Sequence, residues 1–137
     1  MWMGTNGGWY PTSPPSWLCT DLYKGLIIQY DSILRFNDYS NFIILGIWHT
    51  DWPDADRVLV EKMMLDKYGR NYINLRKYLV DYGLGDANIT PTTQDTTNIN
   101  AGKIPSSLLA DSVHLNSYGQ QIVANQIYLR GQELGYW

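Results

Sequence analysis

The amino-acid sequence predicts an α/β fold with a parallel sheet, and two observations favour this class. Apolar segments of strand length alternate along the chain with segments whose apolar residues recur at helical spacing. Residues 42–48 form a continuous apolar run, which is the pattern of a strand covered on both faces. Because strands and helices alternate, right-handed crossovers would place helices on the faces of the sheet.

Length, composition and charge limit the class of protein. With 137 residues, 45% of them hydrophobic, the chain is expected to form one domain over residues 1–137 with its own core. A net charge of −3 gives no electrostatic basis for binding nucleic acid, and no apolar run has the length of a membrane span. The lone Cys19 cannot form an intrachain disulfide.

The first part of the chain is expected to contain a strand end and a helix. Met1-Trp2-Met3 has the pattern of a buried strand that runs into a glycine-rich turn ending near Tyr10. A helix is expected to begin at Thr20 or Asp21 and to end at about Asn37. Its apolar positions, expected to face the sheet, are Leu22, Leu26, Tyr30, Ile33 and Phe36.

The middle of the chain is expected to contain two strands and two helical segments. The run at 42–48 is the first of these two strands, and a helix over about 54–68 follows it. Residues 71–75 are a second, short strand candidate, which leads into a helical turn at 76–82. Residues 83–105 are polar with little periodicity, so a long loop is expected there, and such loops often cover a site.

A polar cluster after the strand expected at 42–48 has two interpretations. The acidic residues at the start of the second helix suit the helix dipole, and this structural interpretation is the simpler one. The alternative is a metal site, but its spacing matches no standard metal-binding loop, so no metal is expected. The residues concerned are His49, Asp51, Asp54 and Asp56.

The segment before the last helix carries the best candidate for chemistry. Asp111 lies three residues before His114, so its carboxylate could accept the Nδ1 proton and leave Nε2 as a general base. The alternative is structural, because Asn116 or Ser117 can cap the helix that follows. That helix is expected over residues 117–134, and its predicted apolar face consists of Tyr118, Ile122, Val123, Ile127 and Leu134, with Gly135 ending it.

Three separated segments are expected to meet at one edge of the sheet. The turn at 4–10, the segment at 48–49 and the loop ending at His114 each follow a strand, where ligands of such sheets bind. Flat aromatic side chains there could stack on sugar rings, or could instead stabilise the core and the loops. The candidate substrate contacts are Trp9, Tyr10, Trp48 and His49, with a structural role as the alternative for His49.

Two of these segments resemble a known family. Gly4-Thr5-Asn6 after a strand, and Asp-x-x-His-Leu-Asn over residues 111–116 before a C-terminal helix, resemble the third and fifth blocks of the SGNH (GDSL-type) esterases and lipases. The likeness covers essentially the whole chain, and residues 83–114 resemble the tail of SGNH domains of gut bacteria and phage tail proteins. It implies a flavodoxin-like three-layer α/β/α fold and no cofactor. It leaves the location open, with extracellular, cell-surface and phage-tail locations as the candidates.

The resemblance also implies roles for three residues. His114 is similar to the family's general base and Asp111 to the carboxylate that orients it. Asn6 is similar to the side-chain donor to the oxyanion, which aims its amide at charge that develops in the tetrahedral intermediate. The family often has Asp after this Asn, whereas this chain has Gly7.

Two blocks of the family are missing from the sequence, the one with the nucleophilic Ser and the one with the Gly that is the second oxyanion donor. The nucleophilic Ser belongs to a Gly-Asp-Ser turn after the first strand, and the only similar segment, Gly85-Asp86-Ala87, has Ala at the serine position. The chain is therefore expected to be the C-terminal part of a hydrolase domain that lacks the first two strands, and to be inactive alone. Another polypeptide, a missing N-terminal segment or a second copy, is expected to cover the strand edge at Met1-Trp2-Met3.

Two other functions remain as alternatives. The chain could be a non-catalytic carbohydrate-binding or assembly module on the same scaffold, which has lost its nucleophile and kept an aromatic cleft. A flavodoxin-like cofactor or phosphate binder is disfavoured, because no suitable glycine loop opens a helix. The favoured hypothesis is an ester hydrolase that acts on an O-acylated substrate, with an acylated carbohydrate preferred over a long-chain lipid.

Overall fold

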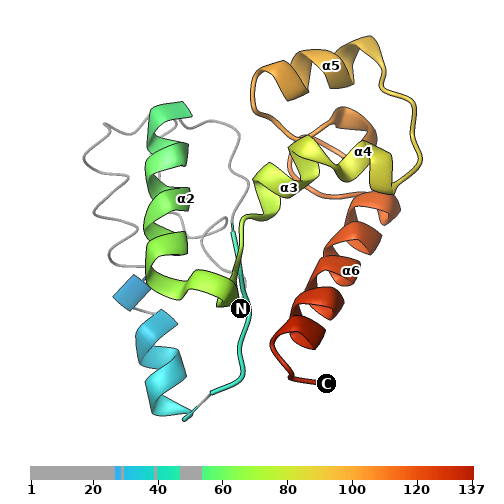
Figure 1. The fold of residues 1–137 in the computed structure, drawn as a ribbon. Coiled ribbons are helices and arrows are strands. Elements are labelled where there is room, and N and C mark those ends of the chain that lie inside the picture. The colour runs from blue at the N-terminus through green and yellow to red at the C-terminus, as the bar shows by residue number, and fades with distance from the viewer. Residues whose placement is uncertain (1–26, 29, 39, 47–53) are drawn as a thin grey trace. The chain divides into compact units, whose positions relative to one another are not determined.

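The structure is a computed structural model that describes residues 27–28, 30–38, 40–46 and 54–137. They form a mixed α/β structure with one pair of parallel strands (Figure 1). Residues 27–28 and 30–36 are helical. The other elements are β1 (Ile44–Leu45), α2 (Asp54–Tyr68), the 3-10 helix η1 (Gly69–Asn71), β2 (Tyr72–Ile73), α3 (Leu75–Asp81), α4 (Gly83–Asp86), α5 (Thr93–Asn100), the 3-10 helix η2 (Ser106–Leu108) and α6 (Ser117–Glu133).

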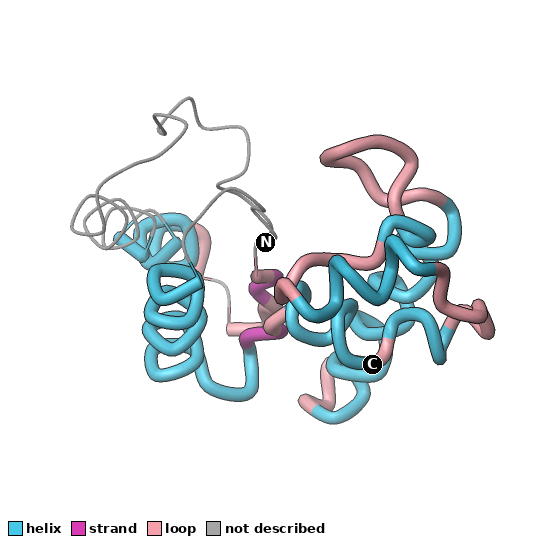
Figure 2. The backbone as a smooth tube through the Cα atoms, turned by 90° about the horizontal axis from the view of Figure 1, so that it is seen from above, coloured by secondary structure: helices cyan, strands magenta, loops and turns pink. Residues whose placement is uncertain are grey.

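The chain divides into two compact units, residues 1–73 and 74–137. In the first unit, β1 and β2 pair in parallel, with Ile44 opposite Tyr72 and Leu45 opposite Ile73, and Figure 2 shows these strands side by side. Gly46 continues the ladder, because its N–H donates to the carbonyl of Ile73 at 2.8 Å. A parallel pair needs a crossover connection, and α2 with η1 lies between the two strands in the sequence.

Aromatic packing and hydrogen bonds hold the first unit together. The ring of Tyr68 meets Tyr30 and Phe42 edge-on, with centroids 6.2 and 6.3 Å away. Its hydroxyl donates to Asp31 at 3.2 Å, and burial together with this carboxylate raises the pKa of the phenol. Asn71 donates from Nδ2 to the Phe42 carbonyl at 2.8 Å, which fixes the turn before β2 to the segment before β1.

Most predicted elements of the first unit are confirmed. The helix expected over about 54–68 is α2, and the strands expected at 42–48 and 71–75 exist, although each is only two residues long within the described part. The strand expected at Met1-Trp2-Met3 lies outside the described residues. Tyr30 is fully buried as expected, whereas Phe36 was wrongly placed on the apolar face and is 92% exposed. Phe36 is the last helical residue before a turn in which Asp38 has a positive φ of 52°. Because the helix ends there, no further helical turn packs beside the ring.

The second unit is helical and packs around the start of α6. Asn74 caps α3 by accepting from the backbone N–H of Lys77 at 3.2 Å. Buried Arg76 donates to the carbonyl of Gly102 at 2.6 Å and so ties α3 to the segment after α5. The buried apolar side chains of this unit are Leu75, Leu79, Leu84, Ile104, Leu108, Leu115, Ile122 and Val123.

The prediction of a long loop over residues 83–105 is wrong, because α4 and α5 lie within this segment. A capping box starts α5: Thr92 accepts from the backbone N–H of Asp95 at 3.1 Å, and Asp95 accepts from the backbone N–H of Thr92 at 2.9 Å. The capping box satisfies two backbone N–H groups at the start of the helix, and the helix has no apolar stripe. Hydrophobic periodicity therefore could not reveal α5, whereas its cap could.

The last helix is confirmed as α6. Asn116 is its N-cap, and Gly135 adopts a positive φ of 72° just after its end, as a C-terminal glycine should. Ile122 and Val123 are buried as expected, but Tyr118 was wrongly assigned to the apolar face, being 55% exposed in the first turn. No helix among the described residues is both long and apolar enough to cross a membrane.

Candidate active site

The candidate site lies on the loop between η2 and α6. Leu109 and Leu115 form an antiparallel bridge, so the residues between them make a closed loop. The backbone N–H of Ala110 donates to the carbonyl of His114 at 2.7 Å, and that of Asn116 donates to the carbonyl of Leu108 at 3.0 Å. We call residues 109–115 the His loop. Its backbone is fixed at both ends and holds Asp111 and His114 together.

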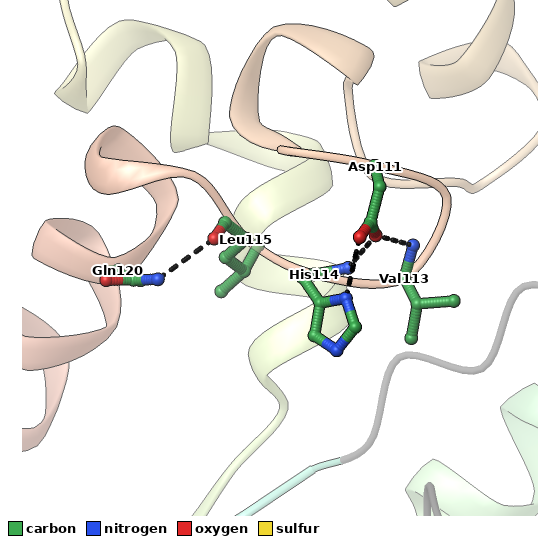
Figure 3. A network of polar contacts seen from close by, with 5 residues as sticks. All are labelled: Asp111, Val113, His114, Leu115 and Gln120. Carbon is green, nitrogen blue, oxygen red and sulfur yellow. Dashed lines mark hydrogen bonds and ion pairs between the residues drawn. The ribbon is translucent and has the colours of Figure 1, made fainter.

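Asp111 organises the inside of the His loop (Figure 3). Its Oδ1 accepts the backbone N–H groups of Val113 at 2.8 Å and of His114 at 2.7 Å. Its Oδ2 lies 2.8 Å from Nδ1 of the His114 ring. The backbone hydrogen bonds from His114 and Val113, followed by the bond to the ring, lower the pKa of Asp111 to about 2. The carboxylate is therefore ionised at neutral pH and accepts a proton from Nδ1.

The imidazole of His114 is oriented as a general base requires. A carboxylate at Nδ1 selects the tautomer in which Nδ1 carries the proton, so the lone pair of the neutral ring is on Nε2. Nε2 has no partner among the residues that the structure describes. The side chain of His114 is 75% exposed and that of Asp111 is 55% exposed, so water reaches both.

The far end of the His loop is fixed by the start of α6. Asn116 accepts the backbone N–H groups of Tyr118 at 3.0 Å and Gly119 at 3.1 Å, and donates from Nδ2 to the carbonyl of Ser107 at 2.8 Å. Gln120 donates from Nε2 to the carbonyl of Leu115 at 3.0 Å (Figure 3). The Asn of the Asp-x-x-His-Leu-Asn motif is thus both a helix cap and a tie across the base of the loop.

The near end of the His loop is fixed by a residue that the sequence did not single out as part of a site. Asp95, at the start of α5, is fully buried and accepts hydrogen bonds from Ser106 and Ser107 in η2. Burial disfavours its charge, but the bonds from Ser107 and Thr92 outweigh this and hold the pKa of the carboxyl well below its usual range. The pattern Thr-x-x-Asp was the signal that could have indicated a helix start there.

None of the serines described by the structure is positioned as a nucleophile. Ser106 and Ser107 both donate their hydroxyls to Asp95, at 2.8 and 2.7 Å. No described serine donates to Nε2 of His114. The described part of the chain therefore holds a hydrogen-bonded His–Asp pair without a serine bonded to the imidazole.

The other predicted site residues lie outside the described residues. They are the oxyanion donor Asn6 and the candidate substrate contacts Trp9, Tyr10, Trp48 and His49. His49 and Asp51 of the alternative metal cluster lie outside them as well. Within the described part of the chain, no group of three or more His, Cys, Asp or Glu side chains could hold a metal ion.

Comparisons with known proteins give no relative. No family model matches the chain, and searches of curated proteins and of solved structures return no significant match. What bears on function is therefore the geometry of the His loop and the resemblance of its residues to the SGNH motif.

Proposed function

We propose that this chain supplies the His–Asp half of an SGNH-type ester hydrolase, with His114 as general base and Asp111 as its orienting carboxylate. One observation carries the proposal. Asp111 Oδ2 lies 2.8 Å from His114 Nδ1, while Nε2 has no partner among the described residues. This is the arrangement by which a carboxylate fixes a catalytic imidazole in acyl transfer.

The proposed mechanism uses a serine from another polypeptide segment. Its hydroxyl oxygen attacks the ester carbonyl while Nε2 of His114 takes the hydroxyl proton. His114 gives this proton to the departing alcohol as the tetrahedral intermediate collapses to an acyl-serine. Water then attacks the acyl group, and His114 takes a proton from it and returns one to the serine. Asp111 stabilises the imidazolium in both steps, and Asn6 is proposed to donate to the oxyanion.

The proposed partner segment would also complete the fold. The described parallel pair is too small for the three-layer sheet of the family, so we propose that the segment adds the missing strands beside Met1-Trp2-Met3. The 75% exposure of His114 supports this, because an acyl-transfer site works best when water is largely excluded. A cover over the His loop would strengthen the Asp111–His114 interaction.

The proposed substrate is an O-acylated carbohydrate. The aromatic side chains of Trp9, Tyr10 and Trp48 could stack on sugar rings, and His49 could contact the same ligand. Six Trp and eleven Tyr in 137 residues provide many flat faces with polar edges. No cofactor is required, because the serine mechanism is complete with protein groups and water.

A complementation experiment tests the proposal. The chain is assayed with p-nitrophenyl acetate and a fluorophosphonate probe, alone and after co-expression with the segment encoded immediately upstream. We expect no labelling and no turnover from the chain alone, and both from the complex, with the label on a serine of the partner segment. Turnover by the pure chain would contradict the proposal, as would a complex that folds but neither reacts nor hydrolyses.

A non-catalytic binding module is the second candidate. The observation that favours it is that the hydroxyls of Ser106 and Ser107, just before the His loop, donate to Asp95, at 2.8 and 2.7 Å. A module that had lost its nucleophile would keep its aromatic contacts and bind a glycan without hydrolysing it. Glycan binding that is abolished by Trp48→Ala, without ester turnover in any complex, would favour this candidate.

A further inference from the structure

Asp95 has an unusual number of hydrogen bonds for a helix-capping residue. Its Oδ1 accepts from Ser106 Oγ at 2.8 Å and from the Ser107 N–H at 2.9 Å. Its Oδ2 accepts from Ser107 Oγ at 2.7 Å, and from the N–H and Oγ1 of Thr92 at 2.9 and 2.7 Å. A capping box needs only the bonds to Thr92. The remaining three bonds connect α5 to η2, immediately before the His loop.

Ser107 is held from two sides. Its N–H and hydroxyl donate to Asp95, and its carbonyl accepts from Nδ2 of Asn116 at 2.8 Å. Asn116 is also the N-cap of α6 and follows the His loop directly. The two ends of the His loop are thus tied through one residue, and Asp95 anchors that residue in the protein interior.

We propose that Asp95 is a positioning residue for His114. By fixing Ser107, its carboxylate sets the start of the His loop and so holds the imidazole at the distance from Asp111 that selects the Nδ1–H tautomer. The catalytic meaning of this role rests on the proposed esterase function, but the geometric role does not. Asp95 itself touches neither the reacting atoms nor the ring of His114.

Charge and burial support the role. A fully buried carboxylate is costly unless it is well hydrogen-bonded, and here all of its donors come from two short segments. Asn in the same position could accept with its single oxygen but would turn an amide N–H₂ toward the donors of Thr92 and Ser107. The ionised acceptor therefore fits this site and the neutral amide does not.

The test measures the state of the His114 ring in the whole chain. The side-chain ¹⁵N shifts of its two nitrogens report the tautomer, and hydrogen exchange of the Val113 and His114 amides reports closure of the His loop. His49→Gln assigns the signals, because the chain contains only two histidines. We expect Ser107→Ala to reduce the Nδ1–H population and to speed exchange of both amides by about tenfold, as for loss of one hydrogen bond to a charged acceptor. Asp95→Asn should reduce the Nδ1–H population and speed the exchange of both amides by more than Ser107→Ala does.

Thr97→Ala is the matched control. It also removes one hydroxyl, which donates to the Thr93 carbonyl at 3.0 Å within α5, but it has no bond to η2. We expect it to leave the tautomer and the exchange of both amides unchanged. If Asp95→Asn fails to fold, Ser107→Ala decides alone.

The outcomes separate this inference from the esterase proposal. If Ser107→Ala lowers the unfolding midpoint yet leaves the ring and both amides as in the wild type, Asp95 is only a structural cap and the inference is wrong. This measurement needs no nucleophile, so it stands whatever the complementation assay gives. In an active complex, Ser107→Ala should lower kcat with little change in KM, and an unchanged kcat would contradict positioning.

Discussion

Asp111 carries out two tasks with one exposed carboxylate. It accepts two backbone N–H groups that close the His loop, and it accepts the Nδ1 proton of His114. The structural and the catalytic interpretations of the motif are therefore not exclusive, because the turn that shapes the loop also aims the carboxylate at the ring. The sequence indicated the pair from its spacing alone, since three residues suffice to bring Asp111 and His114 together.

The hydrogen bonds of Asp111 give a prediction about pH. Its pKa lies at about 2 in the folded chain, below the ordinary value of 3.8, so the fold favours the ionised form. The stabilisation of the His loop is therefore fully present above 3.8 and is lost as the pH falls from 3.8 through about 2. We expect the ¹³C signal of the Asp111 carboxyl to titrate with a midpoint near 2. A midpoint near 3.8 would mean that the loop hydrogen bonds do not form in solution.

At the scale of elements, the second unit shows which signals in a sequence predict structure. α6 was predicted because apolar residues recur along it and a polar residue, Asn116 or Ser117, can cap its start, and α2 was predicted from the acidic residues at its start. α5 was missed because its sequence, TQDTTNIN, is almost entirely polar, and its stability comes from the Thr92–Asp95 capping box and the bonds of Asp95 to η2. These bonds join residues 11 and 12 positions apart, and no periodic pattern reports them.

The cap of α5 can be tested by substitution. Thr92→Ala removes both the acceptor for the Asp95 N–H and a donor to the buried carboxylate. We expect it to lower the free energy of unfolding by about 1–2 kcal/mol, measured by urea denaturation. Thr92→Ser keeps the hydroxyl and should lose much less. Equal losses from the two variants would show that the hydroxyl is not what stabilises α5.

The contact of α6 with η2 depends on a glycine. A Cβ on Gly119 would lie 2.7 Å from the Leu108 carbonyl oxygen and 2.9 Å from Cδ2 of Leu115, so α6 would have to move away from η2. We expect Gly119→Ala to destabilise the fold by about 1–3 kcal/mol. Gly85→Ala in α4 is the control, because nothing lies within 4 Å of its Cβ, and it should be neutral or stabilising by up to about 1 kcal/mol. If both substitutions are tolerated equally, the close approach is absent.

At the scale of the whole molecule, the α/β class predicted from the sequence is confirmed, whereas the predicted three-layer sheet stays a prediction. Ile44–Leu45 and Tyr72–Ile73 pair in parallel as expected, because an apolar strand, a helix and a second strand follow one another with a crossover of suitable length. The three-layer sheet remains a proposal, since a two-stranded pair fixes neither the number of layers nor the strands that would complete it. Asn6 and the aromatic contacts lie outside the described residues, so their predicted roles are untested.

The rate of ester hydrolysis in the completed domain tests the central claim most directly. The measurement is kcat of the complex between this chain and the proposed serine-bearing segment, for the wild type and for His114→Ala. We expect the substitution to lower kcat by about 10³-fold or more, because no other group would take the serine proton. A His114→Ala complex that hydrolyses the ester at the wild-type rate would contradict the assignment of His114 as the general base.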